Sequence, residues 1–232
     1  MTDRALSPDR PTFSPFEPLF VAVEELPPAF REQFLHGPDD DWGIELRGTV
    51  HRVWFRPGWL APLFFLLEQL GILISQRGSE LPLTLAVVPQ VDSYRRPFHI
   101  WARSFFFHGR RRFFDTVVVY QRSSGRLCDL VGPRNAVMVE WDAAFVSPDT
   151  LTLNTARCGF RVGERLCWLP NWFWPWVFGR VRFSQRAELS SDDTVHTSMT
   201  IHHPLLGDIY GYDCTLRVQR TNENAGEQWQ ME

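Results

Sequence analysis

The chain has 232 residues, a formal net charge of −3, 44% hydrophobic residues and 14% aromatic residues. This length accommodates a single large domain with a sizeable core, and the charge argues against a nucleic-acid-binding protein, which needs a basic excess. All 24 basic residues are arginine, which excludes a lysine Schiff base or a P-loop lysine and makes arginine the only cationic anchor for a carboxylate or phosphate.

Metal and cofactor motifs are not evident. His196 and His202 are close in the sequence, but six residues of strand separate them by about 20 Å, too far to bind one ion. We therefore predict no metal and no cofactor. The N-terminus carries charges and prolines where a signal peptide needs an apolar run, so we expect a cytoplasmic location, with peripheral attachment to the inner membrane as an alternative. No C-x-x-C spacing relates the four cysteines, Cys128, Cys158, Cys167 and Cys214.

The N-terminal third contains the expected helices. Residues 1–25 are rich in proline and acidic residues and predict a mobile lead-in. Residues 25–37 predict a short helix ended by glycine, and an extended pattern begins at Gly43. Residues 58–74 form an apolar stretch that is too short to span a bilayer and is interrupted by Glu68. We predict a core helix there, with an interfacial helix as the alternative.

The rest of the chain predicts strands at short spacing. Segments such as PFHIWARSFFF and RRFFDTVVVYQR are separated by turn signals such as HGRR and SSGR. Residues 180–189 and 195–201 alternate between apolar and polar positions, as expected of an antiparallel sheet with one buried face. We predict a mainly β domain over residues 26–220, followed by a polar tail. It consists of about ten strands in a highly curved antiparallel sheet or a closed, lipocalin-like or helix-grip-like barrel, with one inserted apolar helix.

One strand combines charged and aromatic side chains on a single face. Alternation over residues 99–107 places an arginine and a histidine among large aromatic side chains, which suits a cavity that orients an apolar acid or phosphate. A structural ion pair or cation–π stacking of Arg103 explains the same pattern. The residues on this face are His99, Trp101, Arg103, Phe105 and Phe107.

A second arginine, Arg157, shares its parity with Leu151, Leu153 and Thr155, and a charge on an apolar face needs a partner or a charged ligand. Its expected internal partner is Glu140 or Asp142; a charged ligand is the other alternative. We assign Trp101, Arg103, Phe105 and Arg157 to ligand binding.

Acid–base catalysis inside an apolar cavity has only weak candidates, because no motif for nucleophilic catalysis is present. The candidates are His99, Asp115, Glu140 and Tyr210.

The stretch WLPNWFWPWVFG, residues 168–179, holds four of the ten tryptophans. We expect Pro175 to break a helix there, so that Trp168, Trp172 and Trp176 do not form one helical stripe. The stretch predicts a barrel cap, a lid over a ligand or a membrane contact, and we add Trp172, Trp174 and Trp176 to the ligand-binding candidates.

Several segments occur in a characteristic order over residues 35–218, namely RGTVHRVWFRPGWLAPLFFLLEQLGI, WARSF, FHGRRRFFDT, LCWLP and HPLLGDIYGY. This order resembles the bacterial family known as domain of unknown function 4166. The resemblance implies a single compact domain and no established activity. Because the family's domain often follows a nicotinamide-binding domain, and this chain has no G-x-G-x-x-G, it also implies a functional link to a separate dehydrogenase.

Together these observations favour a module that binds a hydrophobic small molecule, lipid- or isoprenoid-like, with an arginine at its acidic head. One alternative is a cavity-type enzyme, a cyclase, isomerase or hydrolase, that uses acid–base residues in the same pocket. Another is a peripheral membrane or partner-binding protein that acts through the tryptophan-rich stretch.

Overall fold

The computed structural model describes residues 14–20, 23–40, 42–56, 58–162 and 165–221. Its strands are β1 (Gly43–Phe55), β2 (Gly78–Val91), β3 (Pro97–Phe107), β4 (Arg110–Gln121), β5 (Arg126–Val131), β6 (Val137–Ser147), β7 (Thr150–Val162), β8 (Arg165–Trp168), β9 (Arg180–Ala187), β10 (Thr194–His203) and β11 (Gly207–Thr221). Its α-helices are α1 (Pro28–Leu35), α2 (Ala61–Gln69) and α3 (Trp174–Phe178), and its 3-10 helices are η1 (Glu17–Leu19), η2 (Val23–Glu25), η3 (Gly58–Leu60) and η4 (Pro133–Asn135).

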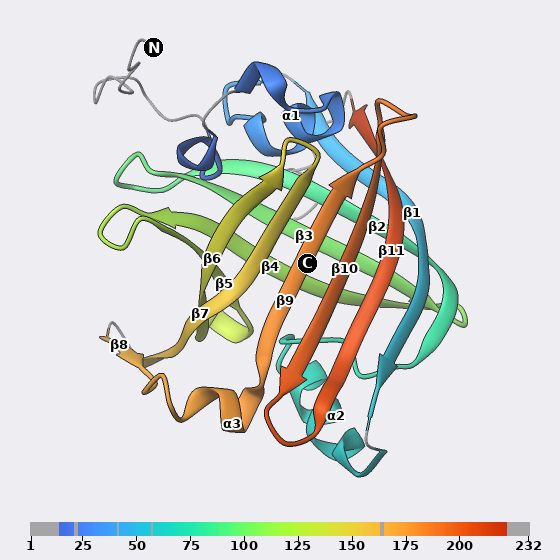
Figure 1. Cartoon of the computed structure of the whole chain (residues 1–232), viewed down its shortest axis with the longest axis vertical. Coiled ribbons are helices and arrows are strands. Elements are labelled where there is room, and N and C mark those ends of the chain that lie inside the picture. Colours follow the sequence, from blue (N-terminus) through green and yellow to red (C-terminus); the bar gives the residue numbers. More distant parts are fainter. Residues whose placement is uncertain (1–13, 21–22, 41, 57, 163–164, 222–232) are drawn as a thin grey trace.

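Ten antiparallel strands form a closed barrel, and β8 extends it as an extra strand paired with β7 (Figure 1). The strands follow the order β6-β5-β4-β3-β2-β1-β11-β10-β9-β7, and pairing of β6 with β7 closes the ring. The prediction of a mainly β, antiparallel closed barrel of about ten strands is therefore confirmed.

Alternation along each strand sends one set of side chains into the barrel. In β9, Val181, Phe183 and Gln185 face inward, and the buried amide of Gln185 donates to the side-chain oxygen of Gln33 in α1 at 2.7 Å. The sequence pattern placed Leu189 on this inward face too. That placement is wrong, because β9 ends at Ala187 and Leu189 is 79% exposed.

Helix α1 covers one end of the barrel (Figure 1), and aromatic side chains fill this end. Phe16 packs on Phe34 with ring centroids 4.8 Å apart, and Phe20 packs on Phe145 at 4.9 Å. Phe16 and Phe20 are buried although they belong to the predicted mobile lead-in, so the packed unit begins before residue 26. Residues 1–13 of that lead-in and residues 222–232 of the predicted tail lie outside the described residues.

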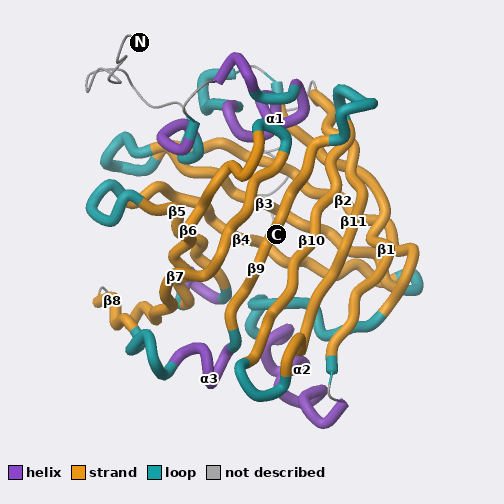
Figure 2. Tube along the Cα trace, in the orientation of Figure 1, coloured by secondary structure: helices purple, strands orange, loops and turns teal. Residues whose placement is uncertain are grey.

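The opposite end of the barrel is bordered by α2 and α3, and Figure 2 shows these helices away from α1. The apolar stretch at residues 58–74 forms only η3 and α2, and the chain leaves the helix through Gly71, whose φ is +61°. Only Phe64 of α2 is fully buried, so the prediction of a core helix is wrong: α2 lies across the barrel end and turns one stripe inward. In the described part of the chain, no helix is long and apolar enough to cross a bilayer.

Trp168, Trp172 and Trp176 do not form one helical stripe, as expected, because Trp168 ends β8 and α3 begins only at Trp174. Pro175 does not interrupt a helix but occupies the first turn of α3, where the missing N–H of proline costs no hydrogen bond. The helix ends at Gly179, whose φ of +74° and close approach to Ile201 and the backbone of His202 exclude a larger residue.

Candidate ligand-binding cavity

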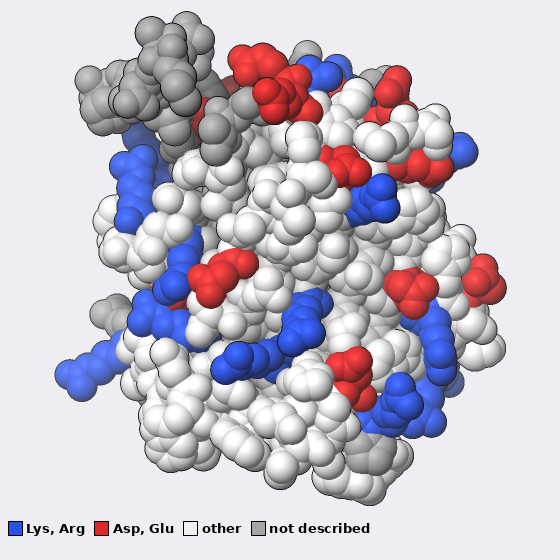
Figure 3. Space-filling model, in the orientation of Figure 1, with Lys and Arg blue, Asp and Glu red and all other residues white. Residues whose placement is uncertain are grey.

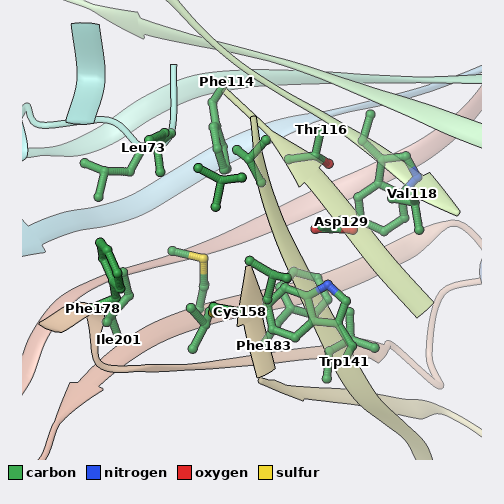
Figure 4. Close-up of a pocket in the computed structure, with 18 of the residues that line it drawn as sticks. Leu73, Phe114, Thr116, Val118, Asp129, Trp141, Cys158, Phe178, Phe183 and Ile201 are labelled. Carbon is green, nitrogen blue, oxygen red and sulfur yellow. The ribbon is translucent and has the colours of Figure 1, made fainter. Parts of the chain in front are cut away.

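A cavity of about 320 Å³ lies inside the barrel between the α1 cap and the opposite end. Figure 4 shows Thr116, Asp129 and Trp141 toward one end of it, and Leu73, Phe178 and Ile201 toward the other. Its wall is mostly apolar, and the lining includes Leu67, Leu73, Val118, Leu127, Val139, Leu153, Phe183, Met199 and Ile201. A cavity of this size and lining falls at the lower end of the range of small-molecule sites, about 300–1,000 Å³.

Arg103 of β3 is the cationic group in this cavity. Its side chain is buried, its Nη1 donates to Oγ1 of Thr116 at 3.3 Å, and its guanidinium lies 5.2 Å from the Trp101 ring and 5.1 Å from the Phe114 ring. Among the described residues, no carboxylate lies within ion-pair distance of it. Stacking and one hydroxyl leave most of the five guanidinium N–H donors available to another acceptor.

Asp129 of β5 is the acidic group in the same cavity. Its carboxyl faces the enclosed space, which removes it from bulk water, and this desolvation raises its pKa to about 6. The charge of Arg103 and the indole N–H of Trp141 oppose the shift without cancelling it. Asp129 therefore changes protonation close to neutral pH.

Two tryptophans add hydrogen-bond donors to this polar region. The buried indole N–H of Trp101 has no hydrogen-bond partner among the described residues, whereas that of Trp141 approaches the Asp129 carboxyl without a hydrogen bond of normal geometry. Tyr212 completes the region, and burial raises the pKa of its hydroxyl to about 12, so the phenol stays neutral. One end of an apolar cavity thus gathers a cation, a titrating acid and neutral donors.

The cavity opens between the C-terminal ends of α2 and α3. Leu70 and Phe178 both line it, and both are more than one-third exposed to solvent. Gly132, just before η4, packs against the carbonyl of Leu70, and Phe160 of β7 contacts Phe178 with ring centroids 5.8 Å apart. The mouth therefore lies at the end of the barrel opposite α1.

The other predicted members of the β3 face lie outside the cavity lining. Phe105 is buried against Tyr212, with ring centroids 6.0 Å apart. His99 is fully buried near Phe16, and its Nε2 donates to the carbonyl of His36 at 2.9 Å. Burial lowers the pKa of His99 to about 3, so the ring is neutral. Its position beneath the α1 cap gives it no access to a ligand in the cavity.

The remaining weak catalytic candidates are also outside the cavity. Tyr210 is buried against Phe64, with ring centroids 5.8 Å apart, and burial raises its pKa. Asp115 is exposed, and its Oδ1 accepts from the backbone N–H of Arg103 at 3.2 Å. In the described part of the chain, no three His, Cys, Asp or Glu side chains converge as metal ligands.

Arg157 pairs with Glu140, one of the two internal partners expected for it. Its Nη2 donates to Oε1 of the buried Glu140 at 3.0 Å, and its guanidinium stacks on Trp168 at 3.8 Å. The face assigned from parity is wrong, because the register passes from Glu140 opposite Arg157 to Trp141 opposite Thr155 and skips Ala156. This β-bulge turns Arg157 away from the cavity that Leu153 lines.

The three tryptophan candidates of the stretch 168–179 separate into two environments. Trp174 is 2% exposed, whereas Trp172 is 74% exposed and Trp176 is 52% exposed. None of the three lines the cavity; Phe178 and Gly179 of the same stretch do.

Asp129 is a charged cavity residue that the sequence-based assignment missed. The signal was available, because Leu127, Asp129 and Val131 share a parity in the strand GRLCDLV, and all three line the cavity. A carboxylate between two apolar residues on one strand face indicates a cavity wall or an ion pair in the same way as an arginine does.

The fold and this cavity define a closed antiparallel β-barrel protein with an apolar, internally charged chamber. The chain belongs to the family described as Domain of unknown function (DUF4166), whose sequence profile matches residues 26–216. This confirms the resemblance noted in the sequence. The chain is also similar to the uncharacterized protein YndH of Bacillus subtilis (strain 168), at 26% identity over 116 residues, or 46% of this chain and 54% of YndH. The match thus spans about half of that relative's length.

Proposed function

We propose that the protein binds a hydrophobic small molecule with an acidic head group in the barrel cavity, a lipocalin-like use of the fold. The observation that carries the proposal is the guanidinium of Arg103, which is buried with no carboxylate at ion-pair distance among the described residues. Burying such a charge costs several kcal/mol unless a partner compensates it, and a ligand carboxylate or phosphate supplies that partner. The free cysteines of the described chain suit a reducing compartment such as the cytoplasm.

The cavity also orients the ligand. Arg103, Thr116 and Asp129 lie in the interior, whereas Leu70 and Phe178 lie at the mouth. The acidic head therefore enters first and contacts Arg103, and the apolar tail extends toward α2 and α3. An anionic head beside Asp129 keeps that carboxyl protonated, so that it donates a hydrogen bond instead of repelling the ligand.

This arrangement predicts a particular dependence on pH. Above the Asp129 pKa of about 6, each pH unit weakens binding of a carboxylate about tenfold, because one proton must be taken up on binding. Binding of the corresponding alcohol, which brings no charge, changes little over the same range.

Titration with cis-parinaric acid and with its alcohol analogue tests the proposal, alongside native mass spectrometry of the protein as purified. Arg103→Met keeps the length and apolar contacts of the side chain and removes the charge. It is expected to weaken binding of the acid by about 10- to 100-fold, because a charge-assisted hydrogen bond is lost. The affinity for the alcohol is expected to change by no more than a few-fold. Arg110→Met, at an exposed position at the start of β4, is the matched control.

Two results contradict the proposal. One is a purified protein that carries no endogenous ligand and takes up neither probe. The other is equal loss of acid and alcohol binding in Arg103→Met, with an unchanged melting temperature, because this would show that Arg103 does not select the charge.

A second candidate function is catalysis in the same chamber, and the titration of Asp129 favours it. A carboxyl with a pKa of about 6 exchanges protons near neutral pH, as a general acid or base requires. Incubation of isoprenoid-like and ester substrates with the wild type and with Asp129→Asn, followed by mass spectrometry, separates the two functions. Conversion that depends on Asp129 supports an enzyme, and unchanged recovery of bound molecules supports a carrier.

A further inference from the structure

We propose that the end of the barrel bearing the cavity mouth docks on an anionic phospholipid bilayer. Large apolar side chains from three separate segments are exposed there. Trp59, Phe65 and Leu66 come from η3 and α2, Trp172 and Trp176 from the α3 region, and Leu205 from the β10–β11 turn. These six residues are named the apolar rim.

Two of the three segments of the apolar rim are held together by direct contacts. At the end of β10, Nε2 of His203 donates to the carbonyl of Trp176 at 2.8 Å, and its Nδ1 accepts from the backbone N–H of Leu205 in the β10–β11 turn at 3.2 Å. This bridge joins the turn to α3. The folded chain thus presents the rim as an ordered surface, which lowers the entropic cost of inserting it.

The apolar rim borders the mouth of the cavity. Leu70, at the end of α2, and Phe178, at the end of α3, line the cavity, are partly exposed and directly follow rim segments in the chain. A hydrophobic ligand leaving the cavity here enters the surface that covers the rim. A bilayer is a surface that can dissolve such a ligand. The use of the rim for ligand transfer rests on the proposed function, whereas binding of the rim to a bilayer does not.

The charges around the rim match an anionic surface. Arg134 in η4, Arg165 at the start of β8 and Arg180 just after α3 are exposed, and within the described chain none of them is in an ion pair. Glu68 and Asp208, carboxylates at this end, are already engaged by Arg112 at 3.4 Å and His202 at 2.8 Å. Figure 3 shows the white surface over α3 with arginine atoms next to it, and acidic groups both near the α1 end and lower on the barrel wall.

The same charges argue against a second copy of the chain as the occupant. A symmetric dimer through the rim brings the arginines of both copies together, and such like-charge contacts oppose association. Anionic headgroups attract these arginines, while tryptophan and phenylalanine are the side chains that settle at the boundary between headgroups and acyl chains.

Vesicle flotation tests the proposal, with vesicles of phosphatidylcholine alone and of phosphatidylcholine with phosphatidylglycerol. The wild type is expected to float with the anionic vesicles and to be released by salt. Arg134→Gln/Arg180→Gln is expected to weaken this partition by roughly 25-fold, about fivefold per arginine near an anionic surface. Trp172→Ser/Trp176→Ser is expected to weaken binding to both kinds of vesicle by about tenfold or more through lost apolar contact.

The control is Tyr94→Ser, which removes an exposed aromatic ring from the turn after β2, at the other end of that strand from α2. It is expected to float like the wild type. Failure of the wild type to float, or flotation unchanged in the tryptophan variant, would overturn the proposal. So would sedimentation of the wild type as a dimer that the tryptophan variant converts to a monomer, because the rim would then be a self-interface.

Titration of each variant with cis-parinaric acid in the absence of vesicles separates this proposal from the proposed function. Probe binding without flotation rejects the docking surface alone, and flotation without probe binding rejects the ligand site alone. Retained probe binding or an unchanged melting temperature shows that the rim variants are folded.

Discussion

Replacement of Asp129 by asparagine is expected to stabilise the protein, with a size set by the shifted pKa. An aspartate in the unfolded chain titrates near its ordinary pKa of 3.8, whereas in the cavity its pKa is about 6. Between these values the folded protein binds more protons than the unfolded chain, so the free energy of unfolding falls as pH rises through this window. Above pH 6 the ionised carboxylate therefore lowers the free energy of unfolding by about 3 kcal/mol. Asparagine has the same shape and is neutral, so it avoids this loss.

Urea unfolding of ligand-free protein, followed by tryptophan fluorescence at a series of pH values, measures this difference. Asp129→Asn is expected to exceed the wild type by about 3 kcal/mol near pH 8 and to match it below about pH 4, where both side chains are neutral. Asp142→Asn, which removes an exposed carboxylate paired with Arg126 on the outer face of β6, is the control and is expected to change little. A variant no more stable than the wild type at pH 8, or equally stabilised at both extremes, would refute the reasoning.

Three further predictions use the same unfolding assay. The pKa of His99 is about 3 in the folded protein and 6.5 in the unfolded chain, so the contribution of His99 to stability is lost as pH falls through this window. His99→Gln is therefore expected to flatten the dependence of the free energy of unfolding on pH between these two values. Arg157→Met leaves the carboxylate of Glu140 buried without its partner and is expected to cost about 3 kcal/mol of stability or more. Glu140→Gln is expected to cost less, because the Arg157 side chain is 32% exposed and water can solvate its charge. Equal costs for the two variants would contradict this difference. Trp174→Ala is expected to cost about 3–5 kcal/mol and Trp172→Ala less than about 0.5 kcal/mol, and similar losses would show that the two rings share one environment.

The barrel was predictable because its signals are local. Turn sequences such as HGRR and SSGR do separate consecutive strands, and alternation in β9 placed Val181 and Phe183 on the inner face. Closure of the barrel was not predictable from local signals, because it depends on the pairing of β6 with β7 at the two ends of the strand order. No local pattern distinguishes a closed barrel from an open curved sheet, which is why both remained open in the sequence.

The face of Arg157 was not predictable because parity carries information only while the strand is regular. One extra residue, Ala156, reverses the direction of every side chain that follows it in β7. Cys158, which parity assigns to the outside with Ala156, therefore lines the cavity. The bulge has no sequence mark such as glycine at that position, so only the register of the partner strand shows it.

The cavity depends on which side chains meet across the barrel, and this lies beyond single-strand patterns. Arg103 of β3 and Asp129 of β5 each follow from alternation in their own strand, but β4 separates the two strands. Their shared chamber exists because the inner residues of the intervening strand are Phe114, Thr116 and Val118, which leave the centre of the barrel unfilled. Residue volumes summed around the ring, and not periodicity, decide whether a barrel of this size is solid or hollow.

The tryptophan-rich stretch shows why composition alone left core, lid and membrane contact undecided. The short helix α3 begins at Trp174 with Pro175 in its first turn, which turns Trp174 inward and leaves Trp176 on the outer side. Trp172 lies in the turn before the helix, beyond the packed interior. An aromatic stretch across the end of a barrel necessarily has both an inner and an outer surface, since a single layer of side chains cannot bury itself. The same segment thus supplies both core packing and the exposed apolar rim. The length and the first residue of α3 determine which tryptophans are buried and which belong to the rim.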